Sequence, residues 1–521
     1  MNENQQNPYN QQPQCEPMPP FAPMLPNNGV RGRAYGVRGM RIPSAFPKWL
    51  SQYPIAVYLI VLAIVSFMYS AYSLPWYYML SGVVSIGVFF LYGSTLAKET
   101  GLDKMRKENR FEKRIFLVAI IPRLFITILL YWIFQSNYGD AFGFENADAQ
   151  YYDRLGGFVA GLIGNGNFHL YDEISRWSRS DDMADMGYGV YVGLVYLLTN
   201  KSIITVRILK CFWSALTVIL IYRLAKRNFG EQTGRMTAIF CALWPNFWYY
   251  CSVHLKETEM VFLTVLFVEQ ADQMLRSRQF TAWKVIPVLL IAAAIATFRT
   301  PLAIVALLSI VFSVVMTSSR VMTWGKRIIV GLLAVTLIGV TAWNSIEENT
   351  RQLVEKVQSH EQEESMQYRT TREHGNSFAK YAGASVFAPM IFTLPFPTMV
   401  RPWDGQEVQQ LLNGGNFTKN IVSFFTIMAL ITLLMSGKWR EHMLPLSFML
   451  GYLIVLTMSS FAQSERFHQP VMPFELMFAA YGLSIAVTQK KYKRWFTYWC
   501  GLMFVATIAW NWFKLAGRGL T

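Results

Sequence analysis

Residues 53–73 read YPIAVYLIVLAIVSFMYSAYS, a run of 21 residues without a charged side chain. As a helix rising about 1.5 Å per residue, such a run is long enough to cross the roughly 30 Å of hydrocarbon in a bilayer. Twelve further runs of similar character follow at 76–97, 115–135, 203–222, 236–251, 257–273, 283–298, 301–317, 328–345, 419–436, 442–461, 470–487 and 495–513. The sequence therefore predicts an all-α polytopic membrane protein with a bundle of about 13 transmembrane helices.

The composition agrees with a chain that has lipid as its main solvent. Hydrophobic residues make up 53% of the chain and charged residues only 15%, which is too little polar surface for a soluble protein of 521 residues. The net charge of +15 raises the question of nucleic acid, but the basic residues lie in short clusters between apolar runs. No nucleic-acid partner is predicted. The five cysteines lie in the tail or inside apolar runs and form no CxxC pair, so no metal site is predicted.

The basic clusters set the predicted orientation, because cytoplasmic loops are rich in Lys and Arg. These clusters fall at 98–114, 223–235, 276–284, 320–327, 438–440 and 490–494. All of them lie inside only if the weaker apolar stretch 187–199 rests on the membrane or dips into it instead of crossing, and this is the least certain part of the topology. The expected location is the cell membrane, inner or plasma, in a multi-pass arrangement with a cytoplasmic N-terminus.

Six regions result from this topology. They are a disordered cytoplasmic tail at 1–48, N-terminal transmembrane helices at 49–135, a first outer loop at 136–202, central transmembrane helices at 203–345, a second outer segment at 346–418 and C-terminal transmembrane helices at 419–521. The tail is rich in Gln, Asn and Pro and cannot build a core.

Most of the unusual polar residues fall on the predicted outer side. The acidic residues of the first outer loop are Asp140, Glu145, Asp148, Asp153, Asp172, Glu173, Asp181, Asp182 and Asp185. Three short outer turns carry Lys256, Arg299, Arg466 and His468. Outer loops are often polar simply because they are exposed to water. The combination of acidic and basic residues is therefore stronger evidence for a site than any single residue.

A sugar linked through phosphate to a polyprenol is a substrate that fits such a site, since its tail stays in the bilayer and its head at the surface. Transfer of the sugar to an acceptor hydroxyl needs a carboxylate to take the proton and cations to stabilise the departing phosphate. The acceptor class, whether lipid, glycan or protein, stays open.

Residues 146–156, NADAQYYDRLG, resemble the start of the first outer loop of the GT-C glycosyltransferases. That superfamily includes the protein O-mannosyltransferases and the lipid A aminoarabinose transferase. Two later stretches are also similar to it: 207–245, with YRLAKRNFG at 222–230 and a following Lys256-Glu257 pair, and ERFHQPVMP at 465–473. The resemblance implies a GT-C-like bundle with two extracytoplasmic loop regions and a membrane glycosyltransferase activity.

The resemblance also implies roles for individual residues. Asp148 is expected to be the general base, Asp153 to orient the acceptor or the sugar, and Arg466 to hold the lipid phosphate. Further candidates for substrate or phosphate contacts are His468, Lys256, Glu257, Arg299 and Tyr151. Many members have two adjacent acids where this chain has Ala147-Asp148-Ala149, so Asp153, Asp140 and Asp172 stay open as alternative bases. No cofactor is expected, and a metal-independent reaction is favoured.

The second outer segment is predicted to start with a polar helix over the site at 346–374. The Pro-rich residues 392–404 then either line the acceptor entrance or form a simple lid. Two other functions remain open. A polysaccharide polymerase or ligase would rely more on Arg and His, and a flippase or transporter would show two related halves and charges at mid-membrane. No repeat is visible, and among the acidic residues only Glu269 and Glu475 lie away from the ends of the spans.

Overall fold

A computed structural model describes residues 46–102, 104–105, 107–178, 184, 186–277, 282–317, 325, 376–378, 388–402, 407–459 and 462–520. Within these ranges the chain is helical, and its only sheet-like pairing is an isolated bridge between Ser73 and Val400. The predicted span 328–345 and the predicted polar helix 346–374 lie outside the described residues, as do Asp181, Asp182 and Asp185.

Twelve of the predicted spans coincide with helices. These are α1 (Lys48–Met68), α2 and α3 (Trp76–Gly87 and Gly93–Thr100), α4 (Glu108–Tyr138), α8 (Ile203–Phe229), α9 and α10 (Glu231–Ala242 and Pro245–Ser252), α11 (Glu257–Arg276), α12 (Ala282–Phe298), α13 (Thr300–Met316), α18 (Asn413–Met435), α19 (Met443–Met458), α21 (Met472–Ala486) and α22 (Lys490–Ala516). In the described part of the chain, 5 helices are long and apolar enough to cross a membrane. The number of 13 spans therefore stays a prediction.

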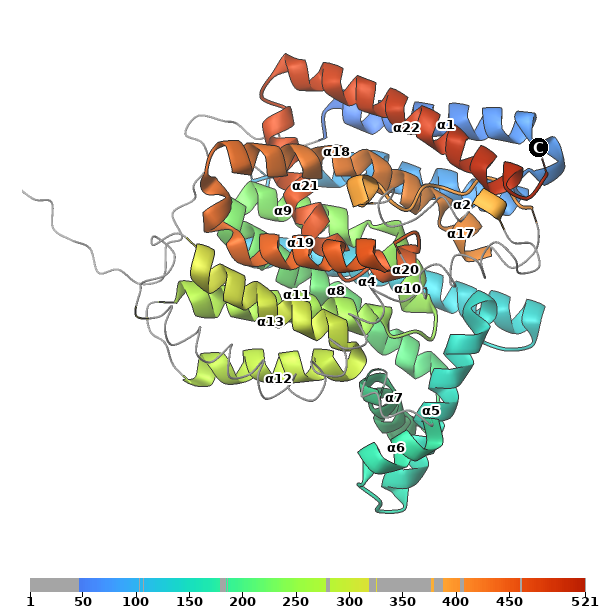
Figure 1. Cartoon of the computed structure of the whole chain (residues 1–521), viewed down its shortest axis with the longest axis vertical. Helices are drawn as coiled ribbons and strands as arrows, with labels where there is room; N and C mark the ends of the chain where they lie inside the picture. The colour runs from blue at the N-terminus through green and yellow to red at the C-terminus, as the bar shows by residue number, and fades with distance from the viewer. Residues whose placement is uncertain are drawn as a thin grey trace, which may run out of the picture. The chain divides into compact units, whose positions relative to one another are not determined.

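The helices of the bundle lie alongside one another (Figure 1). Helix α1 packs on α22, α18 packs on α21, and α21 in turn packs on α9. On another side, α13 contacts α19 and α12, and α12 contacts α11. This packing of apolar helices is typical of a polytopic membrane protein.

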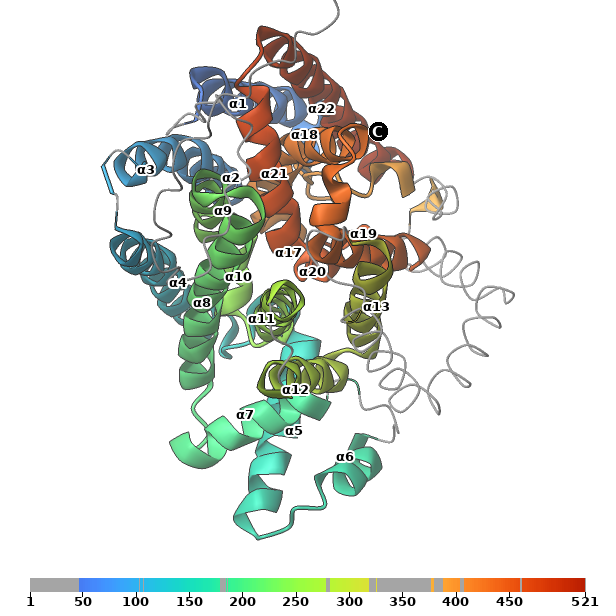
Figure 2. The same cartoon turned by 90° about the vertical axis from the view of Figure 1, so that its left-hand side faces the viewer.

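Three helices form the predicted first outer loop: α5 (Asn146–Gly164), α6 (Leu170–Ser178) and α7 (Met186–Thr199). They gather at one end of the bundle, where α5 packs on α7 and α7 on α12 (Figure 2). Glycines permit the close approach, because a Cβ on Gly156 would lie 2.3 Å from a Val192 methyl and one on Gly193 would lie 2.7 Å from a Val159 methyl. With 14 residues, α7 is shorter than the roughly 20 residues that a transmembrane helix needs.

A buried arginine stabilises a break between α9 and α10. Pro245 begins α10 and cannot continue α9, so the carbonyls at the end of α9 lose their helical partners. Arg123 of α4 is fully buried and donates hydrogen bonds to Ala242 O (3.0 Å) and Cys241 O (3.1 Å). The same guanidinium also bonds Ser214 Oγ (2.8 Å), so it ties α4, α8 and α9 together.

An extended segment, residues 393–400, is buried against α18 and α22. Two asparagine side chains bond its backbone: Asn420 Nδ2 donates to Pro395 O (3.1 Å), and Asn511 Oδ1 accepts from Met399 N (2.7 Å). Backbone that is not helical is tolerated at membrane depth where protein groups satisfy it. The structure thus places this Pro-rich segment inside the bundle, while its predicted role as an entrance or lid stays open.

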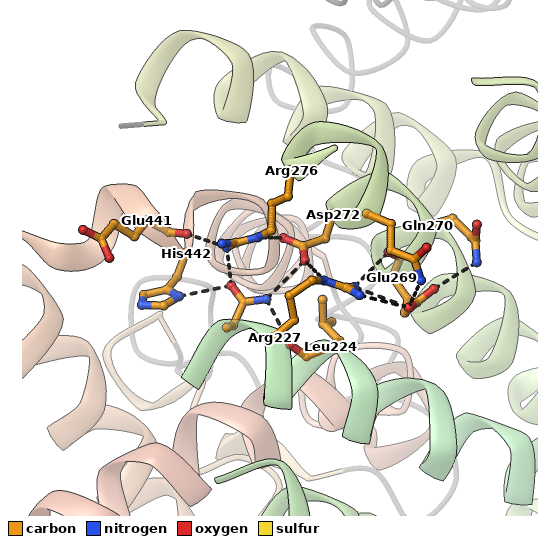
Figure 3. Close-up of polar contacts among 10 residues, drawn as sticks. Leu224, Arg227, Glu269, Gln270, Asp272, Arg276, Glu441 and His442 are labelled. Carbon is orange, nitrogen blue, oxygen red and sulfur yellow. Dashed lines mark hydrogen bonds and ion pairs between the residues drawn. The ribbon is translucent and has the colours of Figure 1, made fainter. Parts of the chain in front are cut away.

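Charged side chains link helices around the C-terminal end of α11 (Figure 3). The Asp272 carboxylate accepts from Arg227 Nε (2.5 Å) and from Arg276 Nε (2.8 Å). Arg276 also donates to Glu441 O (2.7 Å), which lies just before α19. This group joins α8, α11 and the start of α19. Arg227 and Arg276 come from clusters predicted to be cytoplasmic, whereas Asp272 lies at the end of the predicted span 257–273.

Candidate functional site

Three residues that are far apart in sequence meet at the end of the bundle that carries α5. Arg466, in the short helix α20 (Glu465–His468), donates from Nη1 to Asp148 Oδ2 and from Nε to Glu257 Oε1. Asp148 lies in the first turn of α5, and Glu257 is the first residue of α11. We call Asp148, Glu257 and Arg466 the outer ion cluster. All three were predicted site residues, although no distance between them was predicted.

The two carboxylates of the outer ion cluster differ in exposure. The Glu257 side chain is 1% exposed and that of Asp148 is 56% exposed, with Arg466 between them at 14%. Burial opposes the positive charge on Arg466, but Glu257 and Asp148 outweigh that effect and raise its pKa above the ordinary value. The Arg466–Glu257 pair is therefore shielded from water, whereas the Arg466–Asp148 pair is partly exposed and the weaker of the two.

Several bonds hold α20, the helix that presents Arg466. His468 Nδ1 lies 2.7 Å from Lys419 Nζ of α18, and its Nε2 lies 2.9 Å from Ala462 O. Because a carbonyl accepts at Nε2, we assign the proton to that nitrogen and the acceptor role to Nδ1. Tyr452 donates to Phe467 O (2.9 Å), and the Arg299 guanidinium lies 4.2 Å from the centre of the Phe467 ring.

His468 itself points away from the outer ion cluster. Residues two apart on a helix project to nearly opposite sides, so His468 faces the core while Arg466 faces α5 and α11. Burial and the nearby Lys419 lower the pKa of His468 well below its ordinary value, which keeps the ring neutral. Its predicted contact with phosphate stays a hypothesis, and the structure supports a role in holding α20.

The remaining predicted residues occupy different surroundings. Asp153 accepts from Tyr196 OH (2.7 Å) and pairs with Lys201 Nζ (3.2 Å), on the side of α5 that faces α7. Lys256 donates to Phe298 O (2.7 Å), the last carbonyl of α12. Tyr151 is 37% exposed, and its ring centre lies 5.7 Å from that of Trp177.

The alternative bases lie elsewhere as well. Asp140 Oδ1 accepts from the backbone N–H of Phe142 (2.8 Å) in the loop before α5, and Asp172 is an exposed residue in the first turn of α6. Of the residues proposed as base, only Asp148 contacts Arg466 in the structure.

A second group of buried charged residues was not predicted from the sequence. It lies beside Tyr188, whose ring centre is 4.9 Å from that of Tyr152. Its members are Arg207 and Lys210 of α8, Glu259 of α11, and His254 in the turn before α11. We call these four residues the inner cation group.

The inner cation group carries more positive than negative charge. Lys210 Nζ lies 3.6 Å from Glu259 Oε2, but Arg207 forms no ion pair with any described carboxylate and bonds only Ala141 O. The Nε and Nη1 donors of Arg207 and both ring nitrogens of His254 are buried without a hydrogen-bond partner among the described residues. A buried guanidinium without a counter-ion is costly, so this group is suited to take up an anion.

The sequence contained only a weak signal for the inner cation group. Arg207 and Lys210 fall inside the apolar run 203–222, and two cations three residues apart lie on one helix face. Charges inside a predicted span mark functional positions by default. No three His, Cys, Asp or Glu side chains of the described residues gather in a way that would hold a metal ion.

Comparison with known proteins found a match to one family model. Residues 188–345 match the sequence model of the family described as dolichyl-phosphate-mannose-protein mannosyltransferase. The matched stretch contains Lys256, Glu257 and Arg299, and neither Asp148 nor Arg466. No curated protein and no solved structure matches the chain. The predicted resemblance is thereby confirmed: over residues 188–345 the chain is similar to the dolichyl-phosphate-mannose-protein mannosyltransferases, and the match supports a membrane glycosyltransferase of the GT-C type.

Proposed function

We propose that the protein transfers a sugar from a polyprenyl-phosphate donor to an acceptor hydroxyl on the extracytoplasmic face, with Asp148 as general base and Arg466 as a ligand of the lipid phosphate. The observation that carries this proposal is the outer ion cluster. It brings a half-exposed carboxylate and a guanidinium together at the end of an apolar bundle. The family match supports the lipid-linked type of donor.

In the proposed reaction, the acceptor oxygen attacks the anomeric carbon while the bond from that carbon to the phosphate oxygen breaks. Asp148 takes the proton of the acceptor hydroxyl, and the bond-breaking electron pair leaves with the phosphate. Arg466 stabilises the charge that develops on this leaving group. Since Arg466 contacts Asp148 in the free protein, an incoming phosphate takes the place of that carboxylate and frees it to act as a base.

The inner cation group offers a second position for phosphate. Among the described residues, Arg207 has two buried donors without partners and no carboxylate that neutralises it. Such donors favour a phosphate oxygen over a neutral ligand. We assign Arg207 as a further phosphate ligand, one that acts before or after transfer.

The test is turnover of polyprenyl-phosphate mannose by purified protein in lipid. Replacement of a general base lowers kcat by roughly 10²–10⁴-fold, so Asp148→Asn should lose transfer while it still binds polyprenyl phosphate. Arg466→Ala should weaken that binding. Glu173→Gln, an acidic residue of α6 that pairs only with Arg176 in the described structure, is the matched control and should transfer sugar at the wild-type rate.

Two outcomes would contradict the proposal. Full transfer by Asp148→Asn would remove this residue as the base and return attention to Asp153, Asp140 and Asp172. Movement of lipid-linked sugar across vesicles without transfer to any acceptor would replace the enzyme with a flippase.

A further inference from the structure

A small cavity lies directly beneath the outer ion cluster. Its wall includes Glu257, Gln469 and Ser214, and its apolar side includes Phe247 and Val261. The volume that a water-sized group can occupy is about 10 Å³, which is room for about one water or one hydroxyl. The cavity therefore suits a single polar group of a ligand whose remainder lies outside it.

Two buried acceptors in this wall have no donor. Glu257 uses Oε1 to hold Arg466, and its Oε2 accepts no hydrogen bond from the described residues. Gln469 Nε2 donates to Glu465 O (2.8 Å), which fixes the orientation of the amide and leaves Oε1 without a partner. Each of the two residues is 1% exposed. Buried acceptors left unpaired are destabilising, so the cavity suits a ligand group that donates hydrogen bonds.

The position of Glu257 indicates which group that is. In a polyprenyl-phosphate sugar the sugar follows the phosphate directly, and here Glu257 both holds the proposed phosphate ligand through Oε1 and lines the cavity. A ligand with its phosphate on Arg466 therefore has its next group close to the cavity. Sugar hydroxyls donate hydrogen bonds, and the apolar side chains of Phe247 and Val261 in the wall offer no competing donor.

We propose that this cavity binds one hydroxyl group of the donor sugar, with Gln469 Oε1 or Glu257 Oε2 as its acceptor, and that Gln469 contributes to the choice of sugar. This inference rests on the proposed function. It goes beyond it by naming a sugar subsite in a part of the molecule where the sequence predicted only phosphate contacts.

The test compares the affinity of the full-length protein in nanodiscs for polyprenyl phosphate with its affinity for polyprenyl-phosphate mannose, glucose, galactose and arabinose. The sugar contribution is the ratio of the two dissociation constants. We expect at least one sugar to improve the binding of the wild-type protein by about 10-fold or more, since a site built on hydrogen bonds rejects a ligand that lacks them. Gln469→Leu should abolish this contribution without changing the affinity for polyprenyl phosphate.

Two further variants isolate the cavity. Val261→Leu adds a methylene to the apolar side without touching a polar group and should also reduce the sugar contribution. Gln410 is the matched control, because it is a fully buried glutamine of α17 (Glu407–Leu411) whose side-chain amide likewise has no hydrogen-bond partner and which is not part of the cavity wall. Gln410→Leu should keep the sugar contribution at its wild-type value.

The outcomes separate this inference from the proposed function. If none of the four sugars binds the wild-type protein more tightly than polyprenyl phosphate, or if Gln469→Leu and Val261→Leu both keep the sugar contribution, the cavity holds only water and the subsite is overturned. An equal loss of affinity for polyprenyl phosphate and for its sugar forms in Gln469→Leu overturns it too, because the change then acts through α20 and Arg466. Failure of the wild-type protein to bind polyprenyl phosphate at all would instead overturn the proposed function.

Discussion

At the scale of single residues, the candidate site depends most on the fork geometry of the Arg466 guanidinium. Its guanidinium bonds two carboxylates at once through different nitrogens. An ammonium is a single point charge and cannot reproduce this fork. We expect Arg466→Lys to weaken polyprenyl phosphate binding by about 10-fold or more, as measured by titration in nanodiscs. Wild-type affinity in this variant would show that a positive charge alone is sufficient.

A substitution of Arg207 should lower the affinity for polyprenyl phosphate without lowering the Tm. Methionine has a similar length, fills the same space and carries no charge. Because Arg207 is buried without a counter-ion, we expect Arg207→Met to bind polyprenyl phosphate less tightly while its Tm stays equal to that of the ligand-free wild type or rises. Thermal unfolding and lipid titration on the same samples check this. A lower Tm with unchanged affinity would assign Arg207 a structural role.

The sequence predicted some of these residues and missed others for physical reasons. Asp148, Glu257 and Arg466 were recognisable because each follows or precedes an apolar run on the same predicted side. The inward direction of His468 depends on the two-residue offset from Arg466 within α20, which the run ERFH does not reveal by itself. Arg207 was not predicted as a site residue because its apolar neighbours made the segment look like an ordinary transmembrane span.

At the scale of elements, the break between α9 and α10 depends on Arg123. Without its guanidinium, Cys241 O loses its donor inside the bundle, while Ala242 O keeps the bond from Trp248 Nε1 (2.9 Å). An unpaired buried polar group costs about 1–3 kcal/mol, so Arg123→Met should lower the free energy of unfolding by about that amount. Arg114→Met is a suitable control, because Arg114 is 42% exposed and pairs with Glu99, which is 53% exposed.

The measurement for this pair is unfolding in mixed micelles, with the loss of helical signal as the readout. The surface pair of Arg114 should contribute about 0–1 kcal/mol. Equal destabilisation by the two substitutions would contradict the special role of Arg123.

Element positions were largely predictable, and their interruptions were not. Twelve predicted apolar runs coincide with helices of the described chain, since hydrophobic length is what a bilayer requires. The division of the predicted span 236–251 into two helices was missed, although Pro245 signals it. The burial of residues 393–400 was not predictable either, because it depends on Asn420 and Asn511, which lie in separate helices.

At the scale of the whole molecule, helix α11 connects two ionic groups. Glu257 lies at its start and Asp272 fifteen residues later, a separation of roughly 22 Å along the helix. Asp272→Asn leaves Arg227 and Arg276 without their shared carboxylate. We expect this substitution to lower Tm clearly and to leave the affinity for polyprenyl phosphate unchanged, because the group lies far from the outer ion cluster.

Parallel measurement of Tm and lipid affinity decides this prediction. A weaker affinity in Asp272→Asn would mean that α11 transmits changes from one end of the bundle to the other. The matched comparison is Glu257→Gln, which changes the other end of the same helix and should weaken polyprenyl phosphate binding.

The arrangement of the whole chain was predictable in its class and only partly in its detail. Periodic apolar runs and basic clusters indicated a helical membrane protein with its acidic residues gathered on one side. The structure does collect Asp148, Glu257 and Arg466 at one end and Arg227, Asp272 and Arg276 at the other. Which helices touch depends on side-chain packing between segments far apart in sequence, and hydropathy alone contains no such information.

The incomplete charge balance of the inner cation group has a consequence for handling the protein. A buried cation without a counter-ion favours any anion that the surrounding membrane supplies. We therefore expect protein extracted gently from its host membrane to retain a phospholipid or polyprenyl phosphate, detectable by native mass spectrometry. Complete removal of lipid should then shorten the time for which the purified protein stays folded. Added polyprenyl phosphate should restore that time.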